Sequence, residues 1–599
     1  MQRTFLSALI ALAAAAPIAA QTPRPSAPIT DVRYEITADS ASVGRHQLGV
    51  SMTFRVNGTA PVILALPAWS PGHYVLIWFA RRVSQFTPEQ NGSPLAWKKL
   101  DYQTWEITPR SAGTVQLSFK YLADAVDRAV AWTAPNFAFF NGTNVFLYPV
   151  GRGFNWPAQV TVRTEPSWRI ATGMDPAPGT NSFQASNYHD LTDMPFYVGR
   201  FAIDSTLVAG KWVRIAFYPA ASLTPARRDR TLGWLQKIFS AHIAVFGEAP
   251  FRNYTVFQRS DTLVNGGGLE HQASQVDEVH VSQLDAGYLP GLYSHEAFHA
   301  WNVKRLRPAD MVPYRYDDAQ PTTWLWVSEG VTDYYGELGT VRGGITDSVA
   351  FFNGIGGFIA QTAGAPGIAV SAASLSPWIS PTDGSGGLYY PKGALIGFLL
   401  DIMIRDGSNN RSSLDHVMRT LYNETYKRGR GFTSADWWRE VGRAAGGKSF
   451  TEFARRYVDG REPLPTDSVM RLAGMQSRSD TLREPRLGIS TATDTGGLSV
   501  TGVSSGGAAS AAGLRVGDRI ISLGDVTITN DDSFGTFRER YTGTALTTLP
   551  VVIRRGTETI TLQLPVRLFS RTVTVVTSIP GAAEKAVRIR NGIMKGTTQ

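Results

Sequence analysis

Two histidines four positions apart, with a glutamate directly after the first, stand in the segment His-Glu-Ala-Phe-His at residues 295–299. On a helix, positions i and i+4 share one face, so His295 and His299 can aim their imidazoles at one metal ion. Zinc suits these ligands, and it lowers the pKa of its bound water to about 7. Glu296, beside the ligands, can take a proton from that water and deliver it to a leaving amine. The alternative is a helix whose two histidines have no ligand role.

A catalytic zinc site needs a third protein ligand and an open fourth position. Glu329 lies in WLWVSEGVTDYYGEL, a helix-compatible segment at residues 324–338, and it can complete a His, His, Glu set. Asp333, one turn further on, can accept a hydrogen bond from the far nitrogen of a ligand histidine and so fix its tautomer. The alternative is a solvated acidic helix face. The many aromatic neighbours disfavour it, because acids among aromatic side chains are costly unless they are paired or bound to a metal.

Glu270 follows a run of glycines in the segment Asn-Gly-Gly-Gly-Leu-Glu-His at residues 265–271. Glycines such as Gly267 and Gly268 let a backbone pass close to a ligand, and the carboxylate that follows can be presented to a cation. In an aminopeptidase, that cation would be the α-amine of the substrate. A plain glycine loop is the alternative, and the zinc-helix pattern nearby favours the functional interpretation.

Peptide hydrolysis also needs a donor to the oxyanion that forms when the carbonyl is attacked. The segment GLYYPKGALIGF at residues 387–398 offers Tyr389 and Tyr390 at the start of a helical run. The alternative is that both tyrosines pack in the interior. For Tyr389 packing is the preferred interpretation, which leaves Tyr390 as the candidate donor.

The elements that must position these groups follow from periodicity, which predicts a multidomain α+β protein. Alternating apolar and polar residues over 21–201 indicate an N-terminal antiparallel β domain. Residues 202–345 mix strand-like runs with helical spacing, including a helix over Pro225–Phe246, and helical periodicity dominates 346–475. After these we expect a polar linker, a region of short β-like runs and a mostly polar tail, at 476–485, 486–568 and 569–599.

Composition restricts the compartment and the partners. The chain contains no cysteine, which excludes disulfides and thiolate ligands, so any metal must be held by His and carboxylate. Residues 1–20 have the pattern of a secretory signal peptide, which predicts export, most simply to a bacterial periplasm. No other segment is long and apolar enough to predict a membrane span. The net charge of +9 is scattered along the chain, which argues against nucleic-acid binding.

The segments GGGLEH, HEAFHAWNVKRLRP, WVSEGVTDYY and YYPKG together resemble the M61 family of metallopeptidases, the glycyl aminopeptidase type, which is distantly related to the M1 aminopeptidases. The resemblance covers most of the chain. It implies an N-terminal β domain, a thermolysin-like catalytic domain, a helical domain and a C-terminal PDZ domain. It also implies one zinc ion per chain and removal of an N-terminal Gly or Ala from peptides with a free N-terminus.

Carried over by position, the resemblance implies a role for each candidate residue. The zinc ligands are His295, His299 and Glu329. The general base is Glu296, the transition-state tyrosine is Tyr390, and Asp333 supports a ligand histidine. The substrate-binding residues are Glu270, Gly267, Gly268 and His271. His271 departs from the pattern, since M1 enzymes have Asn there, and this puts a backbone contact with the substrate in doubt.

The PDZ prediction also rests on residues of its own. The segment RLGIS at 486–490 can form a carboxylate-binding loop in which Leu487, Gly488 and Ile489 present backbone amides to a peptide C-terminus. The segment GGAASAAGLRVGDRIISLGDVTI at 506–528 resembles the Ala-Gly-Leu-x-x-Gly-Asp core of bacterial PDZ modules. The alternative is a PDZ fold whose groove is vestigial or packs on the catalytic domain.

The leading hypothesis is therefore an exported zinc aminopeptidase whose PDZ domain docks a substrate or partner by its C-terminal peptide. One alternative is a periplasmic PDZ adaptor with little or no catalysis, and the complete zinc set with its base, Glu296, disfavours it. A zinc endopeptidase is the other alternative. Glu270 disfavours an endopeptidase, because an acid that pairs with an α-amine requires cleavage at the first peptide bond.

Overall fold

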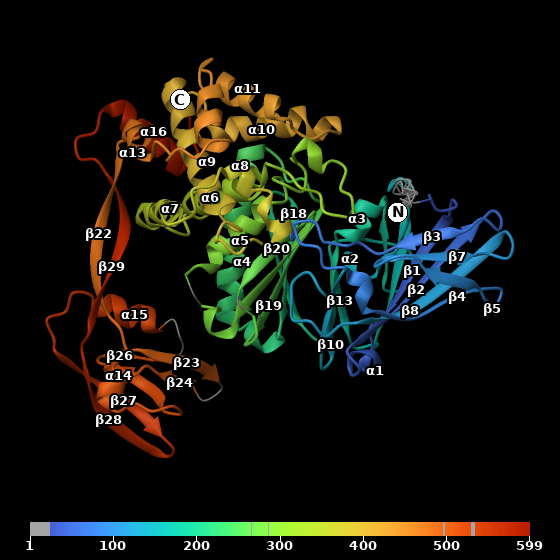
Figure 1. Ribbon diagram of the computed structural model, residues 1–599, viewed down its shortest axis with the longest axis horizontal. Helices are drawn as coiled ribbons and strands as arrows, with labels where there is room; N and C mark the ends of the chain where they lie inside the picture. Colours follow the sequence, from blue (N-terminus) through green and yellow to red (C-terminus); the bar gives the residue numbers. More distant parts are fainter. Residues whose placement is uncertain (1–23, 265, 286, 495–496, 529–532, 599) are drawn as a thin grey trace, which may run out of the picture.

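The computed structural model describes residues 24–598, except 265, 286, 495–496 and 529–532. The predicted signal peptide, residues 1–20, lies outside the described residues. The chain forms a β domain at one end, an α/β layer and a helical layer in the middle, and a small β-rich domain at the other end, joined to the rest by a long two-stranded ribbon (Figure 1).

The N-terminal domain is built from sheets, as alternation predicted. Its large sheet has the strand order β14-β15-β12-β1-β2-β8-β4-β5, and smaller sheets have the orders β13-β16-β10-β9 and β11-β3-β7-β6. Pairing is antiparallel except that β1 runs parallel to β12. The long strands are β1 (Thr30–Thr37), β2 (Gln47–Val56), β4 (Val83–Gln90), β8 (Gly113–Leu122) and β12 (Ala158–Arg163). The shorter ones are β3 (Val62–Ala65), β5 (Ser93–Pro94), β6 (Ala96–Lys99), β7 (Thr104–Thr108), β9 (Trp132–Ala134), β10 (Phe137–Asn141), β11 (Tyr148–Pro149), β13 (Arg169–Thr172), β14 (Asp175–Pro176), β15 (Ser182–Ala185) and β16 (Pro195–Gly199).

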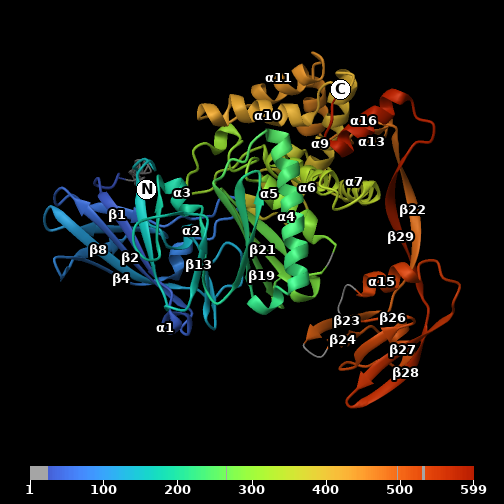
Figure 2. The ribbon, with the colours of Figure 1, turned by 180° about the vertical axis from the view of Figure 1, so that it is seen from behind.

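The catalytic domain pairs a sheet with long helices. The sheet order is β17 (Ala202–Val208), β18 (Lys211–Tyr218), β19 (Asn253–Asp261), β21 (Ser274–His280) and β20 (Gly267–His271). The middle strands run parallel, while β17 and β20 are antiparallel edge strands. Helix α4 (Pro225–Phe246) crosses the back of this sheet (Figure 2), and the predicted helix bounds are confirmed. It begins there because Thr224 caps the first turn before Pro225, and it ends where Gly247 is left-handed, with φ +86°.

Helices α5 (Leu289–Phe298) and α6 (Val331–Arg342) pack against each other beside the sheet, and the helical layer lies above them. Its main helices are α7 (Ser348–Ala363), α9 (Tyr389–Gly407), α10 (Leu414–Glu424) and α11 (Ser434–Ala444). Shorter ones are α8 (Val370–Ala373), α12 (Thr451–Phe453) and α13 (Thr466–Leu472). The N-terminal, catalytic and helical regions share one continuous buried core, which extends from Val32 to Ile593. A rigid frame of this kind can hold side chains from distant segments in fixed positions.

The segment expected to be a linker, 476–485, is a strand, and that prediction was wrong. Strand β22 (Met475–Pro485) pairs along its whole length with β29 (Leu568–Ser578), and this ribbon carries the C-terminal domain. Its side chains are polar because most of the ribbon faces solvent on both sides. Polarity without glycine or proline inside the run is therefore compatible with a strand.

The prediction of a mostly polar tail over 569–599 was also wrong. Its first part is β29, and helix α16 (Glu584–Lys595) then returns to the helical layer, where it packs on α9 and α6. Ile589 and Ile593 are fully buried, and Arg342 Nε donates to Ile593 O at 3.0 Å. The C-terminal segment is thus part of the buried core, whereas the sequence predicted a polar tail.

The C-terminal domain has the predicted β-rich PDZ architecture and its own core. Its sheet order is β23 (Ile489–Asp494), β24 (Gly497–Val503), β25 (Arg519–Leu523), β27 (Thr548–Arg555) and β28 (Glu558–Pro565), with β26 (Val526–Thr527) paired to β25. Helices α14 (Ala508–Ala512) and α15 (Ser533–Arg540) cover it.

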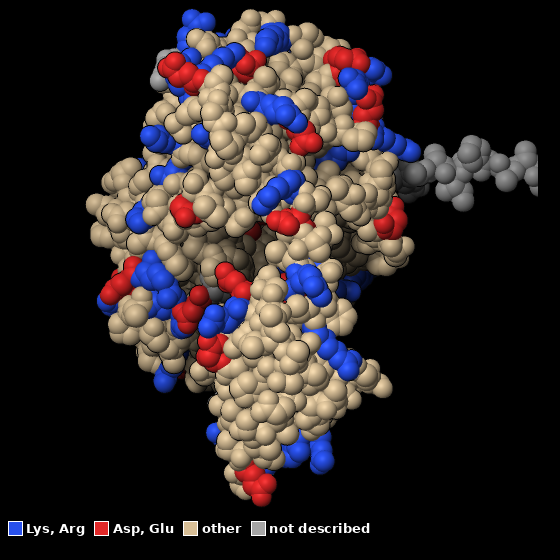
Figure 3. Space-filling view, turned by 90° about the vertical axis from the view of Figure 1, so that its left-hand side faces the viewer, with Lys and Arg blue, Asp and Glu red and all other residues tan. Residues whose placement is uncertain are grey.

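None of the helices in the described part of the chain has the length and apolar character needed to cross a bilayer. On the face shown in Figure 3, Lys and Arg are intermixed with Asp and Glu, and no basic band runs across it.

Candidate active site

Helix α5 and the segment after it bring the predicted ligand atoms together. His295 lies in the last turn of α5, and His299 is its C-terminal cap. His295 Nε2 is 3.0 Å from His299 Nε2. Glu329 Oε2 is 3.3 Å from His299 Nε2 and 3.7 Å from His295 Nε2. The three residues form a group whose ligand atoms are close enough to hold one metal ion.

The donor set fits a zinc ion. In tetrahedral coordination at about 2.0–2.1 Å, neighbouring ligand atoms lie about 3.3 Å apart, which is the scale of the three distances above. The far nitrogen of each histidine lies next to an acceptor: His299 Nδ1 is 2.7 Å from Asn302 O, and His295 Nδ1 is 2.8 Å from Asp333 Oδ1. The contact with Asn302 O assigns the ring proton of His299 to Nδ1, and the nearby carboxylate of Asp333 favours a proton on Nδ1 of His295. Both Nε2 lone pairs and a carboxylate therefore converge on one point, an arrangement that a cation stabilises.

Glu329 is presented by an unusual helical turn. It lies in η5 (Trp326–Gly330), a π-helical turn that continues into α6. The turn is held because Asn302 Nδ2 donates to Val327 O at 2.8 Å, and because Gly330 lies against Gly393 of α9. A β-carbon added at Gly330 would be 2.5 Å from Gly393 Cα. Two glycines thus let the ligand turn and α9 approach closely.

Glu296 points into the cleft beside the ligands. Its side chain is buried, and no donor in the described part of the chain bonds its Oε2. Burial raises the pKa of Glu296 to about 7, although His295 and His299 oppose this. A β-carbon added at Gly268 would collide with the Glu296 carboxylate, so the glycine leaves the base its space.

Glu270 lies close to both the base and a ligand. Atoms of Glu270, Glu296 and His299 able to bind a metal all lie within 4.8 Å of one another. Burial raises the pKa of Glu270, and Lys304, whose Nζ is 3.9 Å from Glu270 Oε1, opposes this. A β-carbon added at Gly72 would collide with the Glu270 carboxylate. The carboxylate of Glu270 is therefore held close to the point where the three ligands converge, without being one of those ligands.

The described part of the glycine-containing segment, Gly267–His271, is strand β20, so the alternative of a plain glycine loop does not hold. Gly267 pairs with Glu278 and Gly268 with Asp277 of β21. Glycine is depleted in strands, so the run resembled a loop. Here the glycines are needed because other side chains occupy the space that a β-carbon would take.

His271 does not reach the cleft, contrary to its predicted place among the substrate-binding residues. Side chains alternate along a strand, so His271 points away from the side that Glu270 faces. Its Nδ1 is 3.1 Å from Asp193 Oδ1, and Lys304 Nζ is 3.1 Å from the same oxygen. His271 therefore joins the catalytic sheet to the N-terminal domain.

Tyr390 lies at the start of α9 and lines the cleft, whose volume is about 540 Å³. Its ring centroid is 6.3 Å from that of His295. Tyr389 is buried, as expected of a packing residue. The cleft also exposes Gly267, Gly268, His295, Glu296 and Asp333, together with Arg128 of the N-terminal domain.

Comparisons with known proteins agree with this geometry. The M61 N-terminal domain model matches residues 33–200, and the model described as M61 glycyl aminopeptidase matches 289–396, which holds the ligands, Glu296 and Tyr390. Both matches are to the M61 family of metallopeptidases. A PDZ domain model matches residues 485–566. Comparison of the sequence with curated proteins gives no significant match.

One solved structure shows the same fold as this chain. An aminopeptidase N family protein from Idiomarina loihiensis is 24% identical over 93% of this chain and 99% of its own, with a TM-score of 0.72. An M1 zinc metallopeptidase from Deinococcus radiodurans is 16% identical over 73% of this chain and 95% of its own, with a TM-score of 0.49.

Several residues of the candidate active site escaped the sequence analysis. Tyr74 OH donates to Glu329 Oε1 at 2.8 Å, and Lys304 Nζ donates to Pro71 O at 3.0 Å beside Glu270. Gly72 and Arg128 also lie against strand β20. Most of these residues are far from the ligands in sequence, so no spacing rule links them. Lys304 had a weak signal, its place shortly after the HExxH helix.

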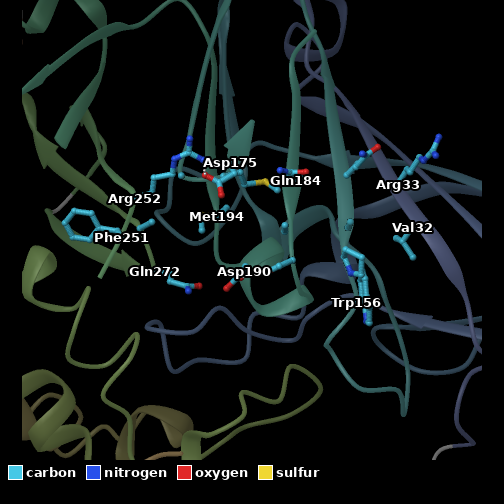
Figure 4. A pocket seen from close by; sticks show the side chains of 18 of the residues that line it. Val32, Arg33, Trp156, Asp175, Gln184, Asp190, Met194, Phe251, Arg252 and Gln272 are labelled. Atoms are coloured by element: carbon cyan, nitrogen blue, oxygen red, sulfur yellow. Dashed lines mark hydrogen bonds and ion pairs between the residues drawn. The ribbon is translucent and has the colours of Figure 1, made fainter. Parts of the chain in front are cut away.

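A second hollow separates the N-terminal and catalytic domains. Its volume is about 870 Å³, and its walls include Trp156, Met194 and Phe251, with Arg252 Nη1 bound to Asp175 Oδ1 at 3.2 Å (Figure 4). None of the predicted site residues lines it. The candidate catalytic residues line the smaller cleft, although the interdomain hollow has the larger volume.

The PDZ residues are placed but their role stays a prediction. Leu487 is buried in the PDZ core, Gly488 has φ +74°, and Ile489 begins β23. Leu487 O accepts a hydrogen bond from Ala509 N, and Gly488 O accepts one from Ser504 N. Both bonds use carbonyl groups of the segment as acceptors, and neither uses one of its backbone amides.

Proposed function

We propose that this protein is a zinc-dependent aminopeptidase that removes an N-terminal Gly or Ala from peptides. The observation that carries the proposal is the placement of Glu270 within 4.8 Å of both the candidate base Glu296 and the ligand His299. A carboxylate so close to the metal-binding point can pair with the α-ammonium of a residue whose own carbonyl is attacked.

The short distance between an α-nitrogen and the carbonyl carbon of the same residue favours cleavage at the first peptide bond. The α-nitrogen of a residue lies about 2.5 Å from its carbonyl carbon, two covalent bonds away. An ammonium bound by Glu270 therefore leaves the first carbonyl beside Glu296, and later carbonyls out of reach. Gly72 and Lys304 lie close to Glu270. They take up space that an endopeptidase would need for the substrate residues that precede the cleaved bond.

Each side chain has a role in the proposed reaction. One zinc ion per chain, held by His295, His299 and Glu329, supplies Lewis acidity at the scissile carbonyl when bound. Glu296 accepts a proton from the attacking water at its free Oε2 and passes it to the leaving amine. The hydroxyl of Tyr390 donates to the developing oxyanion. Asp333 keeps the proton of His295 on Nδ1.

The remaining parts of the proposal rest on the family and the sequence. The preference for Gly is what the name of the matched family model suggests, and Ala is added from the sequence resemblance. Export to a bacterial periplasm is supported by the signal-like pattern of residues 1–20. The PDZ domain offers a site for the C-terminal peptide of a substrate or partner.

A panel of aminoacyl reporters tests the proposed function. We expect purified protein to hydrolyse glycyl and alanyl reporters, to act poorly on N-acetylated versions, and to stop when a chelator removes the metal. Zinc should restore activity at one equivalent per chain. Equal rates on free and acetylated reporters would replace the aminopeptidase with an endopeptidase, and no hydrolysis of any peptide would favour a binding role.

A further inference from the structure

Arg128 places an unpaired cation in the cleft. It belongs to a loop of the N-terminal domain, is half-buried, and lines the cleft together with Glu296 and Tyr390. A β-carbon built on Gly267 would lie 3.1 Å from Arg128 Nη1, so the guanidinium rests against that glycine. Within the described ranges, the Arg128 side chain donates no hydrogen bond, and no carboxylate oxygen lies within 4.0 Å of it.

Each of the acids near Arg128 has another hydrogen-bond partner, although Asp277 Oδ1 has none among the described residues. Glu278 pairs with Arg259, and Asp277 accepts a hydrogen bond from Gln275 Nε2 at 2.7 Å. Asp127 Oδ1 accepts from the amide of Ala129 at 2.7 Å. The guanidinium thus remains available for an anion that enters the cleft.

Strand β20 sets the distance between Arg128 and the proposed amine site. It is the edge strand of the catalytic sheet, so an extended peptide can lie along it. Glu270 and Gly267 are three residues apart on this strand, or about 10 Å at 3.3 Å per residue. A peptide whose ammonium is at Glu270 therefore has its third residue level with Gly267, next to Arg128.

We propose that Arg128 binds the C-terminal carboxylate of tripeptide substrates, so that the cleft recognises both ends of a short peptide. The planar guanidinium matches a carboxylate with two parallel hydrogen bonds, which a peptide carbonyl cannot offer. The inference rests on the proposed aminopeptidase function and adds the substrate class, short peptides with a free C-terminus.

Matched triglycine substrates test the proposal. We expect the parent enzyme to cleave Gly-Gly-Gly with a kcat/KM about 10- to 100-fold above that of its C-terminal amide, as a charge-assisted hydrogen bond implies. Arg128→Ala should abolish this preference, and Arg128→Lys should retain part of it. Hydrolysis of a glycyl anilide, which has no carboxylate, should fall less in Arg128→Ala than hydrolysis of the free acid does.

Controls separate this subsite from folding and from the proposed function. Arg45→Ala, at an exposed arginine of the same domain, should keep the full preference. The preference should also fall for pentaglycine, whose carboxylate lies beyond Arg128. An enzyme that cleaves the anilide but treats acid and amide alike overturns the subsite alone. An equal loss on acid, amide and anilide in Arg128→Ala would make Arg128 a structural residue, and a parent inactive on all three refutes the aminopeptidase as well.

Discussion

His295, His299 and Glu329 can act as ligands because their neighbours decide which atoms are free. Asn302 O and Asp333 take the Nδ1 protons, and Nε2 of each histidine is left with its lone pair. The sequence predicted the ligands and Asp333 because helix geometry links His295 with His299 and Glu329 with Asp333 at a spacing of four, although the two pairs lie in separate segments. It could not predict contacts supplied by other domains.

Glu296→Gln tests the base. The amide fills the same space and Glu296 is not among the three converging ligands, so metal content should not change. Because the amide cannot accept the proton, kcat should fall about 100- to 10,000-fold. Measuring kcat beside metal content by atomic absorption checks both points. Activity within a factor of about three of the parent would remove Glu296 from the mechanism.

Tyr74→Phe tests the support of a ligand from the N-terminal domain. The variant loses the hydrogen bond to Glu329 Oε1, so zinc affinity should weaken about 10-fold or more, as for other groups that orient a ligand. Competition with a chromophoric chelator measures this. Tyr121→Phe is the matched control, since its buried hydroxyl has no partner among the described residues. Equal affinities in the two variants would contradict the assigned support.

At the scale of elements, periodicity predicted some segments and misread others. Helix α4 was predicted with its bounds because Thr224, Pro225 and Gly247 give local start and stop signals. Strand β20 was missed because its glycines are there to make space for Glu296, a reason that lies outside the strand. Strand β22 was missed because a solvent-facing ribbon has no apolar face to alternate.

Gly393→Ala tests the close crossing of α9 and the ligand turn. Its β-carbon would be 2.5 Å from Trp326 O, a backbone atom that can move only by displacing Glu329. Overpacking of this kind costs about 1–3 kcal/mol, so we expect a lower Tm and reduced zinc binding. Gly233→Ala in α4 is the control, since nothing lies within 4 Å of its added carbon, and it should not lower the Tm. A Gly393→Ala variant as stable as the parent would refute the constraint.

At the scale of the whole molecule, the cleft is assembled between domains while the PDZ domain stands apart. The N-terminal domain contributes Gly72, Tyr74 and Arg128 to the cleft, and it shares a core with the catalytic domain. The PDZ domain has its own core and is joined through the ribbon. The ribbon is anchored where Gly356 of α7 packs against the backbone of Thr574 in β29.

Deleting residues 486–567 tests this separation. Pro485 and Leu568 are paired across the ribbon, so a two-residue Asn-Gly turn can join them. We expect kcat/KM on a glycyl reporter to stay within a factor of about three, because none of the described PDZ residues lines the cleft. A large loss on this small reporter would show that the PDZ domain takes part in the chemistry.

The most direct test of the central claim combines Glu270→Ala with substrate acetylation. The account holds that Glu270 pairs with the substrate ammonium, and removing one partner of a buried charge pair costs about 2–5 kcal/mol. Glu270→Ala should therefore lower kcat/KM on a free alanyl peptide by about 100-fold or more, with zinc content unchanged. Acetylating the peptide should cost the parent a similar factor and the variant little, since both changes remove the same interaction. If the parent cleaves the acetylated peptide as fast as the free one, or if the two losses simply add, Glu270 does not read the N-terminus and the aminopeptidase account is wrong.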